Sequence, residues 1–132
     1  GEYNRDGLNL RALYARASLD NVAELNAALG LQGEESIGES MFGGYIQAGY
    51  DLLAGNPRGM GLTPYIRFEK VNTQDDVPAG FLVDPGSDRT IWTFGLEYRP
   101  IFNVVVKADY QAFDNEADTA VDQFNIALGY SF

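Results

Sequence analysis

The sequence predicts an all-β protein whose six antiparallel β-strands form the C-terminal portion of a larger up-and-down transmembrane β-barrel. Three observations support this prediction: apolar and polar residues alternate in six segments, short and long connections alternate between them, and Tyr or Trp residues lie near segment ends. No run of 18 or more apolar residues occurs, so a transmembrane helix is excluded. The membrane prediction therefore rests on period-two alternation, the pattern of outer-membrane barrels.

In each segment the apolar, often aromatic, set falls on even numbers and the polar or small set falls on odd numbers, with Ile91 as the exception in the fourth segment. The even positions of the first three segments are Leu8, Leu10, Ala12 and Tyr14; Phe42, Ile46, Ala48, Tyr50 and Leu52; and Leu62, Pro64, Ile66 and Phe68. The first two of these segments show the alternation least clearly. Pro64 cannot donate a ladder hydrogen bond, so we expect it near the start of its strand.

The last three segments alternate more regularly, and the sixth is the clearest. Their even positions are Trp92, Phe94, Leu96 and Tyr98; Val104, Val106, Ala108, Tyr110 and Ala112; and Phe124, Ile126, Leu128, Tyr130 and Phe132. If the fourth and fifth segments form a hairpin that turns at 100–103, opposed residues have numbers that sum to an even value. Attraction between opposite charges then favours the register that places Arg99 opposite Val105 and Glu97 opposite Lys107.

The connections alternate in length along the chain. Short ones lie at 55–59 and 99–103 and are rich in Gly, Pro and Asn, which tight turns require. Long ones lie at 20–40, 74–88 and 114–120. Outer-membrane barrels have short periplasmic turns and longer extracellular loops. We therefore expect residues 1–132 to be a single membrane-embedded barrel region whose three long connections are extracellular loops.

The first long connection contains a helix signal. The run Asn21-Val22-Ala23-Glu24 resembles a capping box, and Gly30 is a typical helix stop. We expect a short helix from Val22 to Leu29. This helix packs the loop in the simpler interpretation and narrows the mouth of a pore in the alternative one.

Alternation alone does not separate a membrane barrel from a soluble sheet, whose apolar face is its interior. Two features favour lipid outside: the even face carries Tyr and Trp near strand ends, as in interfacial girdles, and the odd face mixes charges with small residues, as in a wet lumen. The predicted pore-lining residues are Arg11, Asp51, Arg67, Glu69, Glu97, Arg99, Lys107, Asp109 and Gln111. Their four basic and four acidic side chains nearly cancel, which predicts weak ion selectivity.

The last ten residues, 123–132, resemble the C-terminal signal by which the barrel-assembly machinery recognises bacterial porins. Asn125, Tyr130 and Phe132 match that pattern, whereas Ala127 replaces the usual glycine. More broadly, the stretches 63–70, 89–93 and 107–111 are similar to the C-terminal half of Gram-negative porins related to the phosphate-selective porin O and P group.

The resemblance implies a passive channel in the bacterial outer membrane, often a homotrimer, with no catalytic residues. We therefore expect an outer-membrane porin that forms a water-filled diffusion channel for small solutes or ions. The implied partners are outer-membrane lipid and lipopolysaccharide, and the barrel-assembly machinery during biogenesis. A structural or scaffold barrel bound to a partner protein is the alternative, and a barrel enzyme is the least favoured class.

Composition excludes several kinds of site. With no His and no Cys, neither a Ser-His pair nor a Cys nucleophile can be built from this chain. The net charge of -10 argues against nucleic-acid partners, which require clustered Lys and Arg. Acidic loop clusters such as Glu34-Glu35 and Asp75-Asp76 are interpreted as solvated charge in preference to calcium sites, because their spacing fits no EF-hand loop. We predict no cofactor and no metal.

Six strands are too few to close a barrel, since single-chain bacterial barrels begin at about eight. Open sheet edges in lipid leave unpaired backbone groups that each cost several kcal/mol. The sequence is therefore expected either to belong to a longer barrel or to share a barrel within an oligomer. The first arrangement is favoured because it is the commoner architecture in bacteria.

Overall fold

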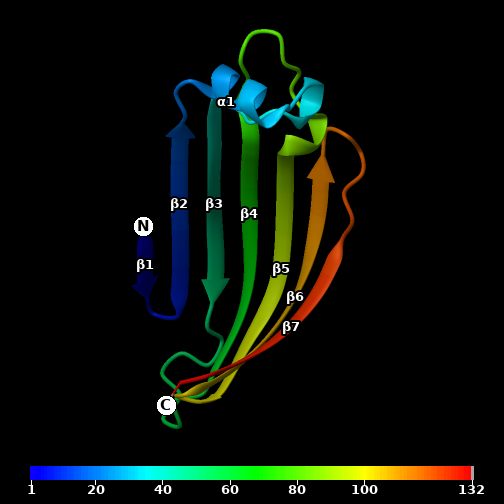
Figure 1. The fold of residues 1–132 in the computed structure, drawn as a ribbon. Coiled ribbons are helices and arrows are strands. Elements are labelled where there is room, and N and C mark those ends of the chain that lie inside the picture. Colours follow the sequence, from blue (N-terminus) through cyan, green and yellow to red (C-terminus); the bar gives the residue numbers. More distant parts are fainter. Residues whose placement is uncertain (132) are drawn as a thin grey trace.

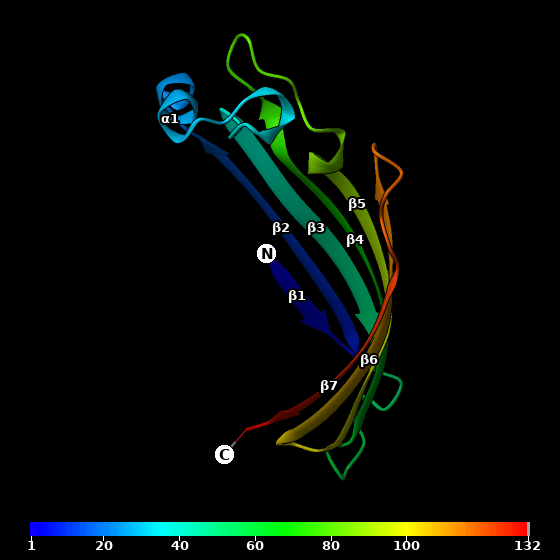
Figure 2. The same cartoon turned by 45° about the vertical axis from the view of Figure 1, so that its right-hand side comes forward.

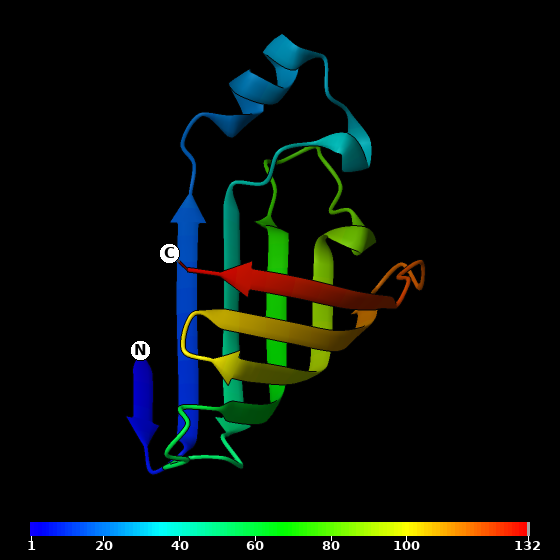
Figure 3. The ribbon, with the colours of Figure 1, turned by 90° about the horizontal axis from the view of Figure 1, so that it is seen from below.

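The computed structural model describes residues 1–131, which form one antiparallel sheet of seven strands in the order β1-β2-β3-β4-β5-β6-β7 (Figure 1). The strands are β1 (Glu2–Arg5), β2 (Leu8–Ser18), β3 (Ser40–Tyr50), β4 (Gly61–Asp76), β5 (Asp88–Ile101), β6 (Val104–Asn115) and β7 (Gln123–Tyr130). Each strand pairs only with its sequence neighbours, so the sheet is a meander. It is strongly curved and not closed, with β1 and β7 at its two edges (Figures 2 and 3). The predicted all-β, antiparallel class is confirmed.

The predicted number of six strands is wrong, because β1 precedes the first predicted segment. Asp6 and Gly7 join β1 to β2, and both have positive φ, 50° and 87°. Asp-Gly is a strong signal for such a two-residue hairpin turn. Gly7 is required there, since a Cβ at this position would lie 2.9 Å from the Ala54 Cβ. The signal was overlooked because the four residues of β1 are too short to show alternation.

The six predicted strands are present, and even numbers pair with even numbers throughout most of the sheet. Glu97 lies opposite Lys107, as predicted. The predicted pairing of Arg99 with Val105 is wrong, since the register shifts between Tyr98 and Ile101 and the turn is only two residues long. Pro100 lies within this shift, and because it has no amide hydrogen it interrupts the ladder there.

The two ends of the sheet differ. Connections of two, ten and two residues join β1 to β2, β3 to β4 and β5 to β6 at one end, called here the turn end. Connections of 21, 11 and seven residues join the remaining pairs at the opposite, loop end, and they fall on the segments predicted to be loops. The predicted alternation of short and long connections is therefore wrong at one place, because the β3–β4 connection at 51–60 is longer than the β6–β7 connection at 116–122. The first loop-end connection contains α1 (Val22–Leu29) and η1 (Gly33–Glu35), and the second contains η2 (Pro85–Ser87). In Figure 1, α1 lies over the ends of β2 and β3.

The predicted helix is confirmed with its stop, since Gly30 ends α1 with a φ of 71°. The capping box is wrong: Asn21 has a φ of 58° and its side chain makes no cap hydrogen bond. The helix is instead held by Asn26, which is fully buried and exchanges hydrogen bonds with the backbone of Ile37. No helix within residues 1–131 is long and apolar enough to cross a membrane.

Buried polar side chains tie the first two long loops together. The Gln74 side chain donates to the carbonyl of Glu34, at 3.1 Å, and to that of Ser36, and it accepts from the Asp84 amide at 2.6 Å. The Leu82 amide donates to the Gly33 carbonyl at 3.1 Å, so the two loops also meet through their backbones. The loop end is therefore a packed layer in which side chains satisfy the backbone groups.

Candidate functional site

The sheet has two chemically different faces. The polar face carries the odd residues of β2 to β7 together with Glu2 and Asn4 of β1, because the two-residue turn after β1 reverses its numbering. The apolar face carries the even residues of β2 to β7. Side chains of the polar face from six strands line one hollow of about 480 Å³. Because residues of six neighbouring strands can line one hollow only on the inner side of a curved sheet, the polar face is the concave one.

All nine predicted pore-lining residues lie on this side of the sheet. Five of them line the hollow itself: Arg11, Asp51, Glu97, Arg99 and Lys107. The other four lie on the same face nearer the loop end, namely Arg67, Glu69, Asp109 and Gln111. Glu2, which the sequence prediction missed with the rest of β1, also lines the hollow. It brings a fifth acidic side chain to a face that was predicted to be nearly balanced.

Three ion pairs organise the charges of the polar face. Arg11 Nη2 lies 3.3 Å from Glu2 Oε1, Arg67 Nε lies 3.1 Å from Glu69 Oε2, and Arg99 Nη2 lies 3.7 Å from Asp51 Oδ2. Each pair neutralises one cation of the polar face.

Asp51 is held in place by more than Arg99. Its Oδ1 accepts hydrogen bonds from the backbone amides of Leu53, at 3.0 Å, and Leu62, at 2.9 Å. Glu97 and Lys107 are different, because the structure shows no ion pair for either within residues 1–131. Although they lie opposite each other across β5 and β6, they are the charges most available to a solute in the hollow.

Two tyrosines on the polar face position the basic side chains. The Arg67 guanidinium carbon lies 3.8 Å from the centre of the Tyr45 ring, and the Lys107 Nζ lies 4.6 Å from that of Tyr65. Such cation-π contacts stabilise a cation without neutralising it. The Tyr65 hydroxyl also donates to Asp109 Oδ2 at 3.4 Å. Lys107 is thereby held over a ring and not against a carboxylate.

Tyr65 on β4 is paired across the sheet with two glycines, Gly49 of β3 on one side and Gly95 of β5 on the other. It is only 8% exposed, and a Cβ added to Gly95 would lie 2.1 Å from its ring. The ring therefore occupies the space that a side chain at position 95 would need. The sequence analysis missed this role, because glycine next to an aromatic residue becomes visible only once the strand register is known.

The apolar face is exposed, which reverses the arrangement of a soluble sheet. Leu128 on this face is 74% exposed, whereas Thr93 on the polar face is 3% exposed. The exposed side chains of the apolar face include Leu10, Ile46, Ile66, Phe94, Leu96, Phe124 and Ile126. A continuous apolar surface of this kind on a protein marks contact with a membrane or with another protein.

Aromatic residues on the apolar face form two rows. One, near the loop end, contains Tyr14, Phe42, Phe68, Trp92, Tyr110 and Phe124, with ring centres 6.5 Å apart for Tyr14 and Phe42 and 4.9 Å apart for Phe68 and Trp92. The other, near the turn end, contains Tyr50, Tyr98 and Tyr130. Measured from the outermost aromatic residue of each strand, the rows are six to eight residues apart, or about 20 to 26 Å along the strand, and Phe94 lies between them opposite Tyr110. The apolar band of outer-membrane barrels is about 25 Å tall.

The acidic loop residues do not form a metal centre. Among residues 1–131, no group of three or more His, Cys, Asp or Glu side chains is placed to hold a metal ion. Asp122 shows what one of these carboxylates does: it accepts hydrogen bonds from the Tyr110 hydroxyl and from the Phe113 amide. These hydrogen bonds hold the pKa of the Asp122 carboxyl below its usual value. Asp122 therefore anchors the start of β7 to β6.

Comparison with known proteins adds little to this geometry. No family model matches the chain. An uncharacterized protein of Aquifex aeolicus (strain VF5) is 30% identical over 92 residues, which cover 70% of this chain and 21% of that protein. No solved structure matches. The class that the fold and the site define is thus an open, seven-stranded antiparallel meander with a charged concave face and an exposed apolar face. The chain spans about a fifth of the length of the relative that it matches.

Proposed function

We propose that the chain forms part of an outer-membrane porin, a barrel with a water-filled channel for the passive diffusion of small solutes or ions. The observation that supports this proposal is the reversal of the two faces: charged side chains converge on a hollow, and large apolar side chains point outward. Exposed apolar surface costs about 25 cal/mol per Å² in water, a cost that lipid removes. The two aromatic rows fit the two interfaces of such a membrane.

The proposal requires further strands. In lipid, the unpaired backbone groups at the outer edges of β1 and β7 would each cost several kcal/mol, so both edges must pair with other strands. Seven strands are also fewer than the smallest single-chain barrels contain. We propose that additional strands, belonging to the same protein, complete the barrel. The much greater length of the Aquifex relative supports this.

The same proposal gives the protein an orientation and partners. The loop end faces the outside and meets lipopolysaccharide, while the turn end faces the periplasm. The relationship to the C-terminal part of Gram-negative porins, a homotrimeric state and recognition by the barrel-assembly machinery through Asn125, Tyr130 and Phe132 all belong to this proposal. Phe132 lies outside the described residues.

A scaffold barrel without a channel is the alternative, and planar-bilayer recording on the whole reconstituted protein would reveal it by the absence of conductance.

Cysteine accessibility tests which face meets lipid, and the chain has no native cysteine to remove. Ile46 and Gln47 are neighbours on β3, with Ile46 exposed on the apolar face and Gln47 lining the hollow. In lipid vesicles we expect Gln47→Cys to react with a charged, water-soluble thiol reagent at least about tenfold faster than Ile46→Cys, because the reactive thiolate does not form in hydrocarbon. Equal or faster reaction of Ile46→Cys would show that the apolar face meets water in the vesicles and would overturn the proposal.

Lys107→Glu tests the channel itself. Because Lys107 lines the hollow without an ion pair among the described residues, the variant places two unpaired acidic side chains, Glu97 and Glu at 107, side by side. We expect the reversal potential in a salt gradient to shift toward cation selectivity, with Lys107→Gln giving a smaller shift in the same direction. Arg58→Glu, in the exposed turn after β3, is the control and is expected to change the potential little. An unchanged potential in Lys107→Glu would remove this face from the conduction path.

A further inference from the structure

We infer that the apolar face carries, at its loop end, a binding site for a phosphate-bearing membrane lipid, the lipid A part of lipopolysaccharide. This lipid site consists of two cations, Arg16 and Lys70, and of the apolar groove that begins beside them. The inference rests on the proposed function, because it places the loop end in the outer leaflet of the outer membrane. It deepens that function by naming the part of lipopolysaccharide that is bound and the residues that bind it.

Arg16 and Lys70 are the basic side chains on the apolar face of β2 to β7 within residues 1–131. They flank β3 from β2 and β4, since Arg16 lies opposite Phe42 and Lys70 lies opposite Gly44. Both lie at the level of the aromatic row near the loop end. In a membrane this is the depth at which lipid phosphates meet the protein, and a Lys or Arg near the surface attracts an anionic lipid.

Each cation already forms an ion pair with an acidic side chain, but the cations are more exposed to solvent than the acids. Arg16 Nη2 lies 3.3 Å from Asp75 Oδ2, and the Lys70 Nζ is paired with Asp88. The side chains of Arg16 and Lys70 are 57% and 40% exposed, whereas those of Asp75 and Asp88 are 31% and 20% exposed. Asp75 and Asp88 thus orient the two cations from their less exposed side. The exposed side of Arg16 and of Lys70 is available to an incoming anion.

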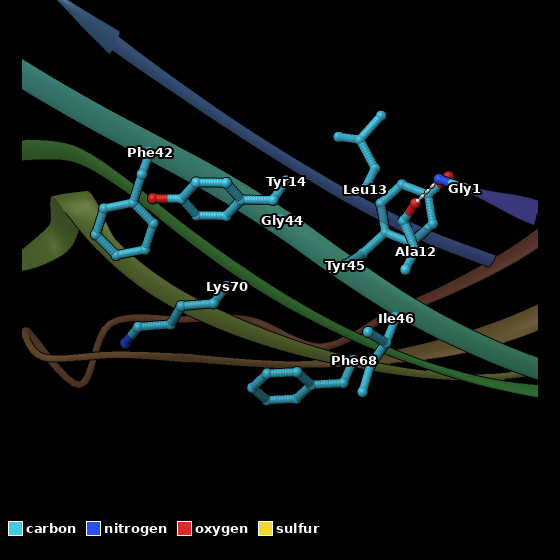
Figure 4. A pocket seen from close by; sticks show the side chains of 10 residues that line it. All are labelled: Gly1, Ala12, Leu13, Tyr14, Phe42, Gly44, Tyr45, Ile46, Phe68 and Lys70. Atoms are coloured by element: carbon cyan, nitrogen blue, oxygen red, sulfur yellow. Dashed lines mark hydrogen bonds between the residues drawn. The ribbon is translucent and has the colours of Figure 1, made fainter.

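An apolar groove of about 630 Å³ starts at Lys70. Apart from Gly1, Leu13 and Tyr45, its lining residues belong to the apolar face: Ala12, Tyr14, Phe42, Gly44, Ile46, Phe68 and Lys70. Figure 4 shows the rings of Tyr14 and Phe42 side by side along one wall, with Lys70 and Phe68 along the other. A Cβ at Gly44 would lie 3.3 Å from Tyr14 Cδ2 and 2.9 Å from the Leu13 carbonyl oxygen. Glycine at this position therefore keeps the floor of the groove low.

The two cations and the apolar groove together select the class of ligand. A free phosphate ion would use the two cations but leave the groove empty, and an uncharged lipid would use the groove but leave the cations without an added partner. A zwitterionic lipid carries its own ammonium beside the phosphate, which weakens its attraction to Arg16 and Lys70. A lipid with phosphate groups and no headgroup cation satisfies both parts of the site, with an acyl chain in the groove and a phosphate between the cations.

The test measures the affinity of the purified, whole protein in detergent micelles for lipid A. We expect the double variant Arg16→Gln/Lys70→Gln to bind lipid A about 5- to 30-fold more weakly, because two surface cations are lost. Arg58→Gln removes one cation at the turn end and should leave the affinity unchanged. Gly44→Ala raises the floor of the groove and should weaken lipid A binding while both cations remain. Unchanged affinity in the double variant would overturn the inference, whatever the result for Gly44→Ala.

Two further measurements separate the possible failures. Inorganic phosphate and phosphatidylcholine are added as competitors, and neither should displace lipid A; displacement by inorganic phosphate alone would replace the lipid site by a simple anion site and overturn the inference. Planar-bilayer conductance is recorded for the same variants. Normal conductance with unchanged lipid A affinity in the double variant overturns the lipid site alone. The absence of conductance in every preparation, including the wild type, overturns the porin function instead.

Discussion

Leu128→Arg is expected to destabilise the membrane-embedded protein by about 2 to 4 kcal/mol, the cost of Arg near the midplane on the lipid-facing side of a barrel. Leu128 is 74% exposed on the apolar face and lies on β7 between Phe124 and Tyr130, which belong to the two aromatic rows. In the proposed barrel its side chain contacts hydrocarbon. The measurement is reversible urea unfolding in phospholipid vesicles, with the free energy of unfolding compared between variant and wild type.

Asn125→Arg is the matched control on the same strand. Asn125 lies on the polar face opposite Asp109 and donates a hydrogen bond to its Oδ1 at 3.0 Å, so an Arg there would gain a carboxylate partner in water. We expect a cost below about 1 kcal/mol, as for other exposed ion-pair sites. Thr93 would be a poor control, because it is 3% exposed and has no room for a larger side chain. Equal costs for Leu128→Arg and Asn125→Arg would contradict the assignment of the faces.

Gly95→Ala is the second change with a large expected effect. The added methyl carbon would lie 2.1 Å from Cζ of Tyr65, so the ring must leave its place beside Lys107 and Asp109. Overpacking of this kind costs about 1 to 3 kcal/mol. We expect a matching loss in the free energy of unfolding, and a change in channel conductance because Tyr65 and Lys107 line the hollow.

Gly43→Ala is the control for this change. Gly43 also lies on the polar face, but a Cβ there would meet Val71 at 3.6 Å, which is an ordinary contact. This variant should be neutral or slightly stabilising, because alanine restricts the unfolded chain more than glycine does. In a double-mutant cycle, Tyr65→Ala should remove most of the cost of Gly95→Ala. A Gly95→Ala variant as stable as Gly43→Ala would show that the ring and the glycine are not coupled.

Features that depend on residues close together in the sequence could be predicted from the sequence. Period-two alternation fixes which side chains share a face, so all nine predicted pore-lining residues lie on the polar face. Charge attraction across a hairpin was enough to find the pairing of Glu97 with Lys107. The helix ending at Gly30 also follows from local sequence, because glycine readily adopts the left-handed conformation that ends a helix.

The sequence by itself therefore determined the all-β class, six of the seven strands, the chemistry of the two faces and the positions of the loops. Tertiary structure alone decided most of the other contacts across the sheet and between the loops. The ring of Tyr65 fills the space above Gly95, and Gln74 joins two loops. These contacts join segments far apart in the chain, or depend on register, so no local pattern encodes them. The curvature of the sheet also belongs to the tertiary structure. It brings the charged side chains of the polar face together around one hollow, which a flat sheet would not do.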